Sequence, residues 1–240
     1  MKTLVVIGDS WTVGQGAEDV DLTNSKLRDF ELVAAYKKFS YASILSSNYL
    51  HGYTVINAAD RGIGNRGAIK NLYLEDSKIL NQISEGYMIF LLSSWARFDY
   101  IHGNILESRV GKMRSMRPSS VGEGNAIVDF YFEHIYNEDS ATAETMLAII
   151  EAQNFAKVHN LKFCFANSFD YRGITEFEKF PNLLDQIDTF KFLNKHRPYR
   201  SFMDLLCKDE KMYMSGCNHP NTAGQQLIAK EFFEFLSQIY

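Results

Sequence analysis

Two short segments at opposite ends of the sequence carry side chains that together could perform nucleophilic catalysis. Gly8-Asp9-Ser10 follows an apolar, β-branched run, so the Ser10 hydroxyl is expected where a strand ends. His219 precedes the apolar stripe of a long predicted helix, which places its ring in a loop. A serine hydroxyl attacks poorly at neutral pH unless a neighbouring base takes its proton. Considered singly, the first segment is also a common turn, and His219 also suits a helix-capping or solvent-facing role.

A glycine-rich segment offers a competing chemistry. Gly62–Gly67 reads GIGNRG and matches the G-x-G-x-x-G of dinucleotide-binding folds, after a predicted strand and before a predicted helix. It follows the second strand rather than the first, and the position about 20 residues further on, near Tyr87, has no acidic side chain to hold a ribose. A nucleotide-dependent enzyme is therefore the third-ranked interpretation.

Other common catalytic motifs are missing from the sequence. It contains no G-x-x-x-x-G-K-[ST], no H-E-x-x-H and no G-x-S-x-G. The three cysteines, at 164, 207 and 217, show no C-x-x-C spacing, so neither a disulfide framework nor a cysteine zinc site is predicted. We expect no metal and no cofactor, and a reducing compartment.

The elements that must position these residues alternate along the chain. Short apolar runs predict four strands buried on both faces, at Thr3–Ile7, Tyr53–Asn57, Tyr87–Leu92 and Leu161–Ala166. Helical patterns occupy about Glu31–Asn48, Gly67–Ser84 and Ser140–His159, and a final helix follows Pro220-Asn221-Thr222, with Pro220 suited to its first turn. This alternation predicts a three-layer α/β/α sandwich with a central parallel sheet, which places functional residues at the carboxyl ends of the strands.

One stretch fits the alternation poorly. Residues from about 95 to 135 combine several arginines with a run of small polar residues, and we interpret them as a loop or cap inserted beside the site of a single domain, residues 1–240. Aromatic side chains are dense at Phe130-Tyr131-Phe132, where core packing is the simplest explanation. Trp11 and Trp95, near the Ser10 edge, could instead stack on a sugar ring.

Composition excludes several classes of protein. The 240 residues are 46% hydrophobic and 22% charged, as in ordinary globular proteins, so a disordered, collagenous or coiled-coil chain is excluded. A net charge of −4 gives no drive toward nucleic acid or anionic lipid. No apolar run has the 18 residues of a membrane span, and Met1–Ile7 is too short for an export signal, so we expect a cytoplasmic protein.

The joint placement of Ser10 and His219 resembles the SGNH (GDSL) hydrolase family. Its members carry a nucleophilic serine in Gly-Asp-Ser after the first strand and a histidine near the C-terminus. The resemblance implies a flavodoxin-like α/β/α fold of the SGNH hydrolase type. It also implies that Gly62, after the second strand, offers its backbone N–H to the oxyanion hole beside the N–H of Ser10.

Two positions depart from the family pattern. Ser94 stands where the family usually has the oxyanion asparagine, so its hydroxyl, or alternatively Ser93, Trp95 or Arg97, would have to donate. Gly216 stands where an aspartate three residues before His219 would orient the imidazole. A backbone carbonyl, Asp170 or Asp209 could hold the ring instead, or Ser10 and His219 could act as a dyad.

We therefore predict a serine esterase of the SGNH type, with Ser10 as nucleophile, His219 as base and then acid, and Gly62 with Ser94 in the oxyanion hole. The family acts on short acyl esters, lipids and O-acetylated sugars, and the polar, aromatic insert favours a glycan ester among small-molecule substrates. The two altered positions motivate an alternative: a catalytically weak SGNH-like module that binds a glycan or a protein partner.

Overall fold

A four-stranded parallel sheet forms the centre of the molecule. The computed structural model describes residues 1–17, 29–74, 80–102, 112–116, 120–169, 172–216 and 218–240. The sheet strands are β1 (Lys2–Gly8), β2 (Thr54–Asn57), β3 (Glu85–Leu92) and β6 (Leu161–Asn167), in the order β2-β1-β3-β6. All three pairings are parallel, and β1 meets β3 from Lys2↔Glu85 to Gly8↔Leu91. The four predicted strands are confirmed.

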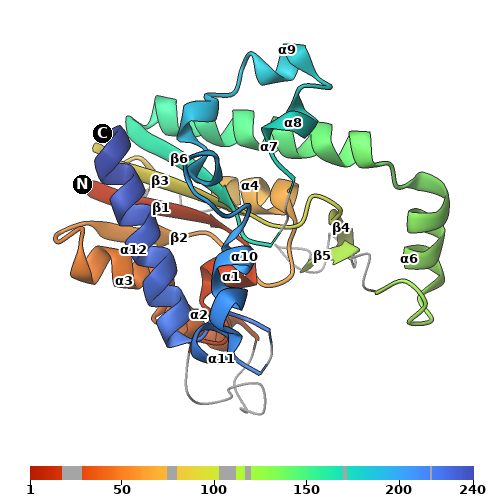
Figure 1. Cartoon of the computed structure of the whole chain (residues 1–240), viewed down its shortest axis with the longest axis horizontal. Helices are drawn as coiled ribbons and strands as arrows, with labels where there is room; N and C mark the ends of the chain where they lie inside the picture. Colours follow the sequence, from red (N-terminus) through yellow and green to blue (C-terminus); the bar gives the residue numbers. More distant parts are fainter. Residues whose placement is uncertain (18–28, 75–79, 103–111, 117–119, 170–171, 217) are drawn as a thin grey trace.

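Helices cover both faces of the sheet, which explains why its strands are apolar throughout. On one face Val5 and Ile7 pack with α4 (Asn65–Leu74) and α7 (Glu138–Val158). On the other face Leu4 and Val6 pack with α3 (Tyr41–Asn48) and α12 (Thr222–Ile239). Figure 1 shows the strands between these two layers, so the predicted α/β/α sandwich is confirmed.

The helices differ from the prediction in their boundaries. The single helix expected over Glu31–Asn48 is wrong, because α2 (Asp29–Lys37) and α3 are separated at Ser40. The Ser40 side chain accepts the Ser43 N–H as the N-cap of α3 and donates to Lys37 O, which ends one helix and begins the next. Pro220 lies outside α12, one residue before the N-cap Asn221, rather than in its first turn.

Shorter helices occupy the remaining connections. The helix predicted over Gly67–Ser84 begins earlier, as α4 at Asn65, and residues 81–84 are not helical. Residues 75–79 lie outside the described chain. The other elements outside the insert are α1 (Ser10–Val13), α8 (Ile174–Phe177), α9 (Pro181–Leu184), η4 (Thr189–Lys191), η5 (Leu193–His196), α10 (Phe202–Leu206), η6 (Cys207–Asp209) and α11 (Glu210–Tyr213).

The stretch predicted as an inserted loop contains secondary structure where it is described. β4 (Phe98–His102) and β5 (Lys112–Met116) form an antiparallel hairpin. Residues 120–136, here called the arm, contain α6 (Ala126–Phe130) and the π-helical turn η3 (Tyr131–Ile135) and extend beyond the sheet at the end of α7 (Figure 1). Residues 103–111 and 117–119 lie outside the described chain.

The outer edge of β6 is covered by groups that do not belong to a neighbouring strand. Phe165 forms a single parallel bridge with Phe192, at the place of a fifth strand in a flavodoxin-like order. Two residues to either side, Phe163 O accepts the Tyr240 hydroxyl and the Asn167 N–H donates to the Asn194 side chain. The Phe163 carbonyl and the Asn167 N–H, on either side of the bridge at Phe165, are thereby occupied.

Candidate active site

The turn after β1 places Ser10 at the carboxyl edge of the sheet. Gly8 adopts a φ of +151°, and a Cβ there would lie 2.6 Å from Leu91 O, so only glycine lets the chain leave the sheet at this point. Asp9 then caps α1, its Oδ1 accepting the Trp11 N–H at 3.0 Å. Ser10 is the first residue of this helix, so its hydroxyl lies beside the edge where β1 ends.

His219 reaches Ser10 from the loop before α12. Its Nε2 lies 2.9 Å from the Ser10 Oγ, within hydrogen-bond distance. The backbone carbonyl of His219 accepts both the N–H and the hydroxyl of Ser215, each at 2.8 Å. Gly16 packs against the histidine, where a Cβ would lie 2.7 Å from the His219 Cβ. The predicted nucleophile and base are therefore brought together across 209 residues of sequence.

The carboxylates considered as partners for the imidazole are placed differently. Gly216 has no side chain with which to contact the imidazole. Asp209 caps α11, its Oδ1 accepting the Met212 N–H at 3.2 Å. Asp170 lies outside the described chain.

The backbone N–H groups of Ser10 and Gly62 belong to residues that line the same cavity as the Ser10 hydroxyl. Gly62 adopts a φ of +71°, and a Cβ at this position would meet no atom within 4 Å. Within the described residues, neither the Ser10 N–H nor the Gly62 N–H donates a hydrogen bond to another protein group. Ser94 is half-buried and its carbonyl accepts the Arg97 N–H at 3.2 Å, which closes a turn after β3.

A buried ion pair ties the loops around Ser10 together. The Arg97 Nη1 lies 2.9 Å from Asp9 Oδ2, 2.8 Å from the Ser93 Oγ and 3.1 Å from Ile63 O. Ser93 in turn donates to the same Asp9 oxygen at 3.1 Å. The Asp9 side chain is fully buried and that of Arg97 is only 11% exposed, so each charge needs the other.

These groups surround one cavity of about 410 Å³, a volume suited to a small ligand. Its charged lining residues are basic, and no carboxylate is among the lining side chains of the described chain. The lining residues are Ser10, Gly62, Arg97 and His219, with Trp11, Gln15, Arg61, Phe169, Met203 and Asn218. Three of the four predicted site residues therefore share the cavity, whereas Ser94 is not among the described residues that line it.

Solved structures with this architecture span the whole chain. TesA is 12% identical, with a TM-score of 0.52 over 100% of both chains. The psychrotrophic esterase EstA from Pseudoalteromonas sp. is also 12% identical, with a TM-score of 0.50 over 99% of this chain and 98% of its own. This chain has the fold of the SGNH hydrolases.

Another enzyme with this fold is an α/β hydrolase from the metagenome of Lake Arreo, Spain. It is 13% identical, with a TM-score of 0.51 over 100% of this chain and 96% of its own. No protein-family model matches the sequence, and no curated protein matches it. The SGNH fold is thus recognised through its three-dimensional arrangement.

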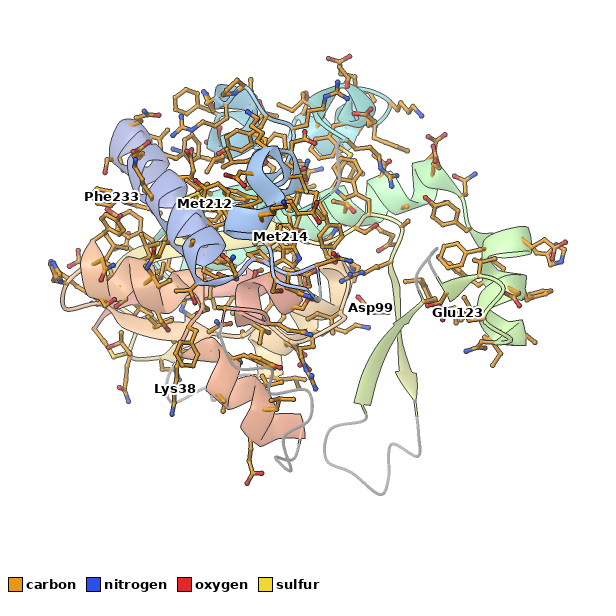
Figure 2. The ribbon with its side chains drawn as sticks, turned by 60° about the horizontal axis from the view of Figure 1, so that its bottom comes forward. Lys38, Asp99, Glu123, Met212, Met214 and Phe233 are labelled. Atoms are coloured by element: carbon orange, nitrogen blue, oxygen red, sulfur yellow. The ribbon has the colours of Figure 1, made fainter. Side chains whose placement is uncertain are left out.

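Within this SGNH fold the glycine-rich segment performs a structural task. The Asp99 carboxylate accepts the Gly64 N–H through Oδ1 and the Gly67 N–H through Oδ2, both at 2.7 Å. Gly64 immediately precedes α4 and Gly67 lies in its first turn, so both N–H groups stand at the helix start, where a dinucleotide phosphate would bind. Figure 2 shows Asp99 where the β4–β5 hairpin meets the sandwich. A side chain of the protein therefore occupies the anion position of the fingerprint.

The aromatic residues singled out in the sequence are placed differently from one another. Trp11 is 2% exposed and lines the cavity, whereas Trp95 is 3% exposed, stacks on Phe177 at 5.1 Å and is not among the described lining residues; stacking of these rings on a sugar stays a prediction. Core packing, expected for the aromatic run at 130–132, is wrong for Phe130, which is 55% exposed in the arm. Phe130 is exposed because the arm extends beyond the sheet.

Sequence reasoning missed the function of Asp9. From the sequence, Asp9 is only the middle residue of Gly8-Asp9-Ser10, and Arg97 is only an alternative donor to the oxyanion hole. A usable signal was present: an arginine close behind a fully apolar strand requires a buried partner.

No described helix is both long and apolar enough to cross a membrane.

Proposed function

We propose that this protein is a serine hydrolase that cleaves carboxylic esters through an acyl-serine intermediate. The observation that carries the proposal is the 2.9 Å approach of His219 Nε2 to the Ser10 Oγ inside a cavity. A free serine hydroxyl needs such a base, and the SGNH fold supplies the strand edge on which the pair is held. EstA, which shares the fold, is an esterase.

The chemistry follows from the positions of these groups. His219 takes the Ser10 proton as the oxygen forms a bond to the ester carbonyl carbon, and the carbonyl oxygen becomes an oxyanion near the N–H groups of Ser10 and Gly62. When the intermediate collapses, the ester C–O bond breaks and the imidazolium gives its proton to the departing alcohol. A water molecule then repeats the sequence on the acyl-serine and releases the acid.

A dyad is sufficient for these steps. With glycine at position 216, the imidazole has no carboxylate partner from that position. The third member of a triad orients the ring and stabilises its charged form, whereas the proton transfer itself needs only the base. Ser94 receives no part in this mechanism, because it is not among the lining residues of the cavity.

The cavity size favours an ester with a short acyl group. About 410 Å³ accommodates a small ester together with part of its alcohol. An O-acetylated carbohydrate belongs to this class and stays a prediction; of the two tryptophans, Trp11 lines the cavity and Trp95 is not among its described lining residues. A panel of short acyl esters that includes acetylated sugars tests the choice of alcohol.

A fluorophosphonate probe tests the proposal directly. We expect an adduct on Ser10, located by mass mapping, that is lost in Ser10→Ala and falls by orders of magnitude in His219→Ala. Ser94→Ala is the matched control, a serine beside the site but outside the cavity lining, and should be labelled at a rate within about threefold of the native protein. A fall of about 10²–10³ in Ser94→Ala would instead identify a missing oxyanion donor.

The alternative of a binding module predicts the opposite result. If Ser10 stays unlabelled while a control hydrolase reacts completely, the hydrolase proposal is wrong. Retention of glycan binding by Ser10→Ala would then support a non-catalytic SGNH-like module.

A further inference from the structure

We infer that Arg97 is the third oxyanion-hole donor and contributes a positive charge where the fold family usually places a neutral amide. This inference rests on the proposed ester hydrolysis, because the oxyanion exists only in that reaction. Arg97 lines the same cavity as Ser10, Gly62 and His219. Five observations, each concerning a different property of the guanidinium, support the assignment.

The first is its position between the two backbone donors. The Arg97 Nη1 contacts Asp9, the residue before Ser10, and the carbonyl of Ile63, the residue after Gly62. The guanidinium therefore lies against both segments whose N–H groups face the reacting carbonyl. A group held at this point is adjacent to the place where the oxyanion forms.

The second is the turn that brings residue 97 to the site. The Arg97 N–H donates to Ser94 O at 3.2 Å, so the chain folds back and residue 97 returns close to residue 94. The position usually held by the asparagine is thus approached by a longer side chain from three residues later. This explains how the cavity can include Arg97 but not Ser94 among its described lining residues.

The third is the supply of donors that the ion pair does not use. The hydrogen bonds of Arg97 to Asp9, Ser93 and Ile63 all involve Nη1. Among the described residues, Nε and Nη2 of Arg97 make no hydrogen bond to a protein acceptor. Neither is a fully buried atom that lacks a hydrogen-bond partner. The three N–H bonds of Nε and Nη2 therefore remain available on a side chain that lines the cavity.

The fourth is rigidity. The Arg97 guanidinium lies 5.0 Å from the centre of the Phe169 ring, and Phe169 itself lines the cavity. Stacking on one side and three acceptors at Nη1 fix the plane of the fork before substrate arrives. Donors fixed in advance stabilise a developing charge more than donors that must reorganise.

The fifth is charge balance. Asp9 neutralises Arg97 in the resting enzyme, so the buried guanidinium is tolerated without substrate. In the transition state the oxyanion adds one negative charge as His219 gains one positive charge. The four groups then sum to zero, and a charge-assisted hydrogen bond from Arg97 is stronger than one from a neutral amide.

Steady-state kinetics on p-nitrophenyl acetate test this inference, with Arg97→Lys as the principal variant. Lysine keeps a positive charge for Asp9, but one ammonium cannot hold Asp9 and also present a planar fork to the cavity. We expect kcat to fall about 10²-fold while KM changes by less than about threefold. Binding of a boronic acid that forms a tetrahedral adduct with serine should weaken by a similar factor to kcat.

Two further variants separate catalysis from folding. Asp9→Asn/Arg97→Gln removes both charges together, so no unpaired carboxylate is left buried, and should show the same fall in kcat. Arg66→Lys is the matched control, because Arg66 pairs with Glu144 and Glu151 away from the cavity lining. It should retain kcat within about twofold.

The outcomes are distinguishable. If the native protein hydrolyses no ester, the proposed function fails before Arg97 is tested. If it is active, and a folded Arg97→Lys protein keeps kcat within about threefold with unchanged boronate affinity, the inference is overturned and the hydrolase proposal stands. A rise in KM alone would also overturn it, because a donor to the oxyanion acts on the chemical step.

Discussion

Asp9 shows how one side chain can serve two elements. Its Oδ1 caps the short helix that begins with Ser10, and its Oδ2 accepts hydrogen bonds from Arg97 and Ser93 in the loop after β3. The carboxylate therefore determines both the direction of the Ser10 backbone and the location of the nearest positive charge. Substitution by a residue that keeps only one of these contacts would disturb the other.

Gly62 gives a test at the level of one residue. At a φ of +71° an alanine is strained by about 1 kcal/mol, although a Cβ would meet no atom within 4 Å. We expect Gly62→Ala to unfold at lower urea concentration and to lose kcat, because relief of the strain turns its N–H away from the oxyanion. Gly52→Ala is the matched control, with a φ of +83° and equally open surroundings. It should lose similar stability and keep kcat; equal loss of kcat in both variants would contradict the role of Gly62.

Several site residues could be predicted from sequence, and the reason differs for each. Ser10, Gly62 and His219 follow or precede recognisable elements, so their shared edge follows from topology alone. The part proposed for Arg97 beside the predicted Ser94 could not be worked out from sequence, because the turn that brings residue 97 back to residue 94 depends on a hydrogen bond between residues without a strong turn signal. The pairing of Arg97 with Asp9 becomes visible only when burial is known.

At the level of elements, α4 begins with a cap supplied from elsewhere in the chain. The first turn of a helix has N–H groups without helical partners, usually satisfied by a nearby side chain. Here Asp99, from β4, accepts the N–H groups of Gly64 and Gly67. The hairpin is thereby tied to the loop that carries Gly62.

We expect Asp99→Ala to lower the free energy of unfolding by about 2 kcal/mol, because two N–H groups at the positive end of a helix lose a charged acceptor. Urea denaturation measures this change. Asp209→Ala provides the comparison, since Asp209 caps the four-residue, exposed helix α11, and should cost about 0.5–1 kcal/mol. Equal losses would show that the contact between Asp99 and α4 adds no more than an ordinary cap.

Helices and strands could be predicted where the residues of the element alone determine it, and not where a specific hydrogen bond decides. The four strands follow from short apolar runs, and all were located. The break at Ser40 was missed, because a serine within a periodic apolar pattern is compatible with a continuous helix until its hydroxyl caps a new one. The hairpin was missed because its two strands lack the alternation that marks a half-buried strand.

At the level of the whole molecule, apolar side chains differ widely in how far they are covered. Those that face the sheet are enclosed, as for Phe165, which stacks on Phe192 at 4.9 Å. Those of the arm include Ile127 and Phe130, which are 67% and 55% exposed. Sequence hydrophobicity does not separate the two, because it records the type of a residue and not what covers it.

This contrast predicts very different costs for the same substitution. Phe165→Ala should lower the free energy of unfolding by about 3–5 kcal/mol, because it empties a closed core site. Phe130→Ala should change it by about 0.5 kcal/mol or less. Urea denaturation of both variants provides the measurement, and a loss above about 2 kcal/mol for Phe130→Ala would show that the arm is packed more tightly than its exposure indicates.

The covered edge of β6 limits how these molecules can associate. An open edge strand offers alternating donors and acceptors to any extended chain that approaches, and it is a frequent starting point for fibrils and for strand exchange. Here three alternate residues of β6 already have partners on this side. These partners are the tyrosine hydroxyl, the single bridge to Phe192 and the Asn194 amide. Concentrated solutions should therefore resist growth of intermolecular β-structure from this side of the protein, and removal of the Tyr240 hydroxyl and the Asn194 amide would reopen it.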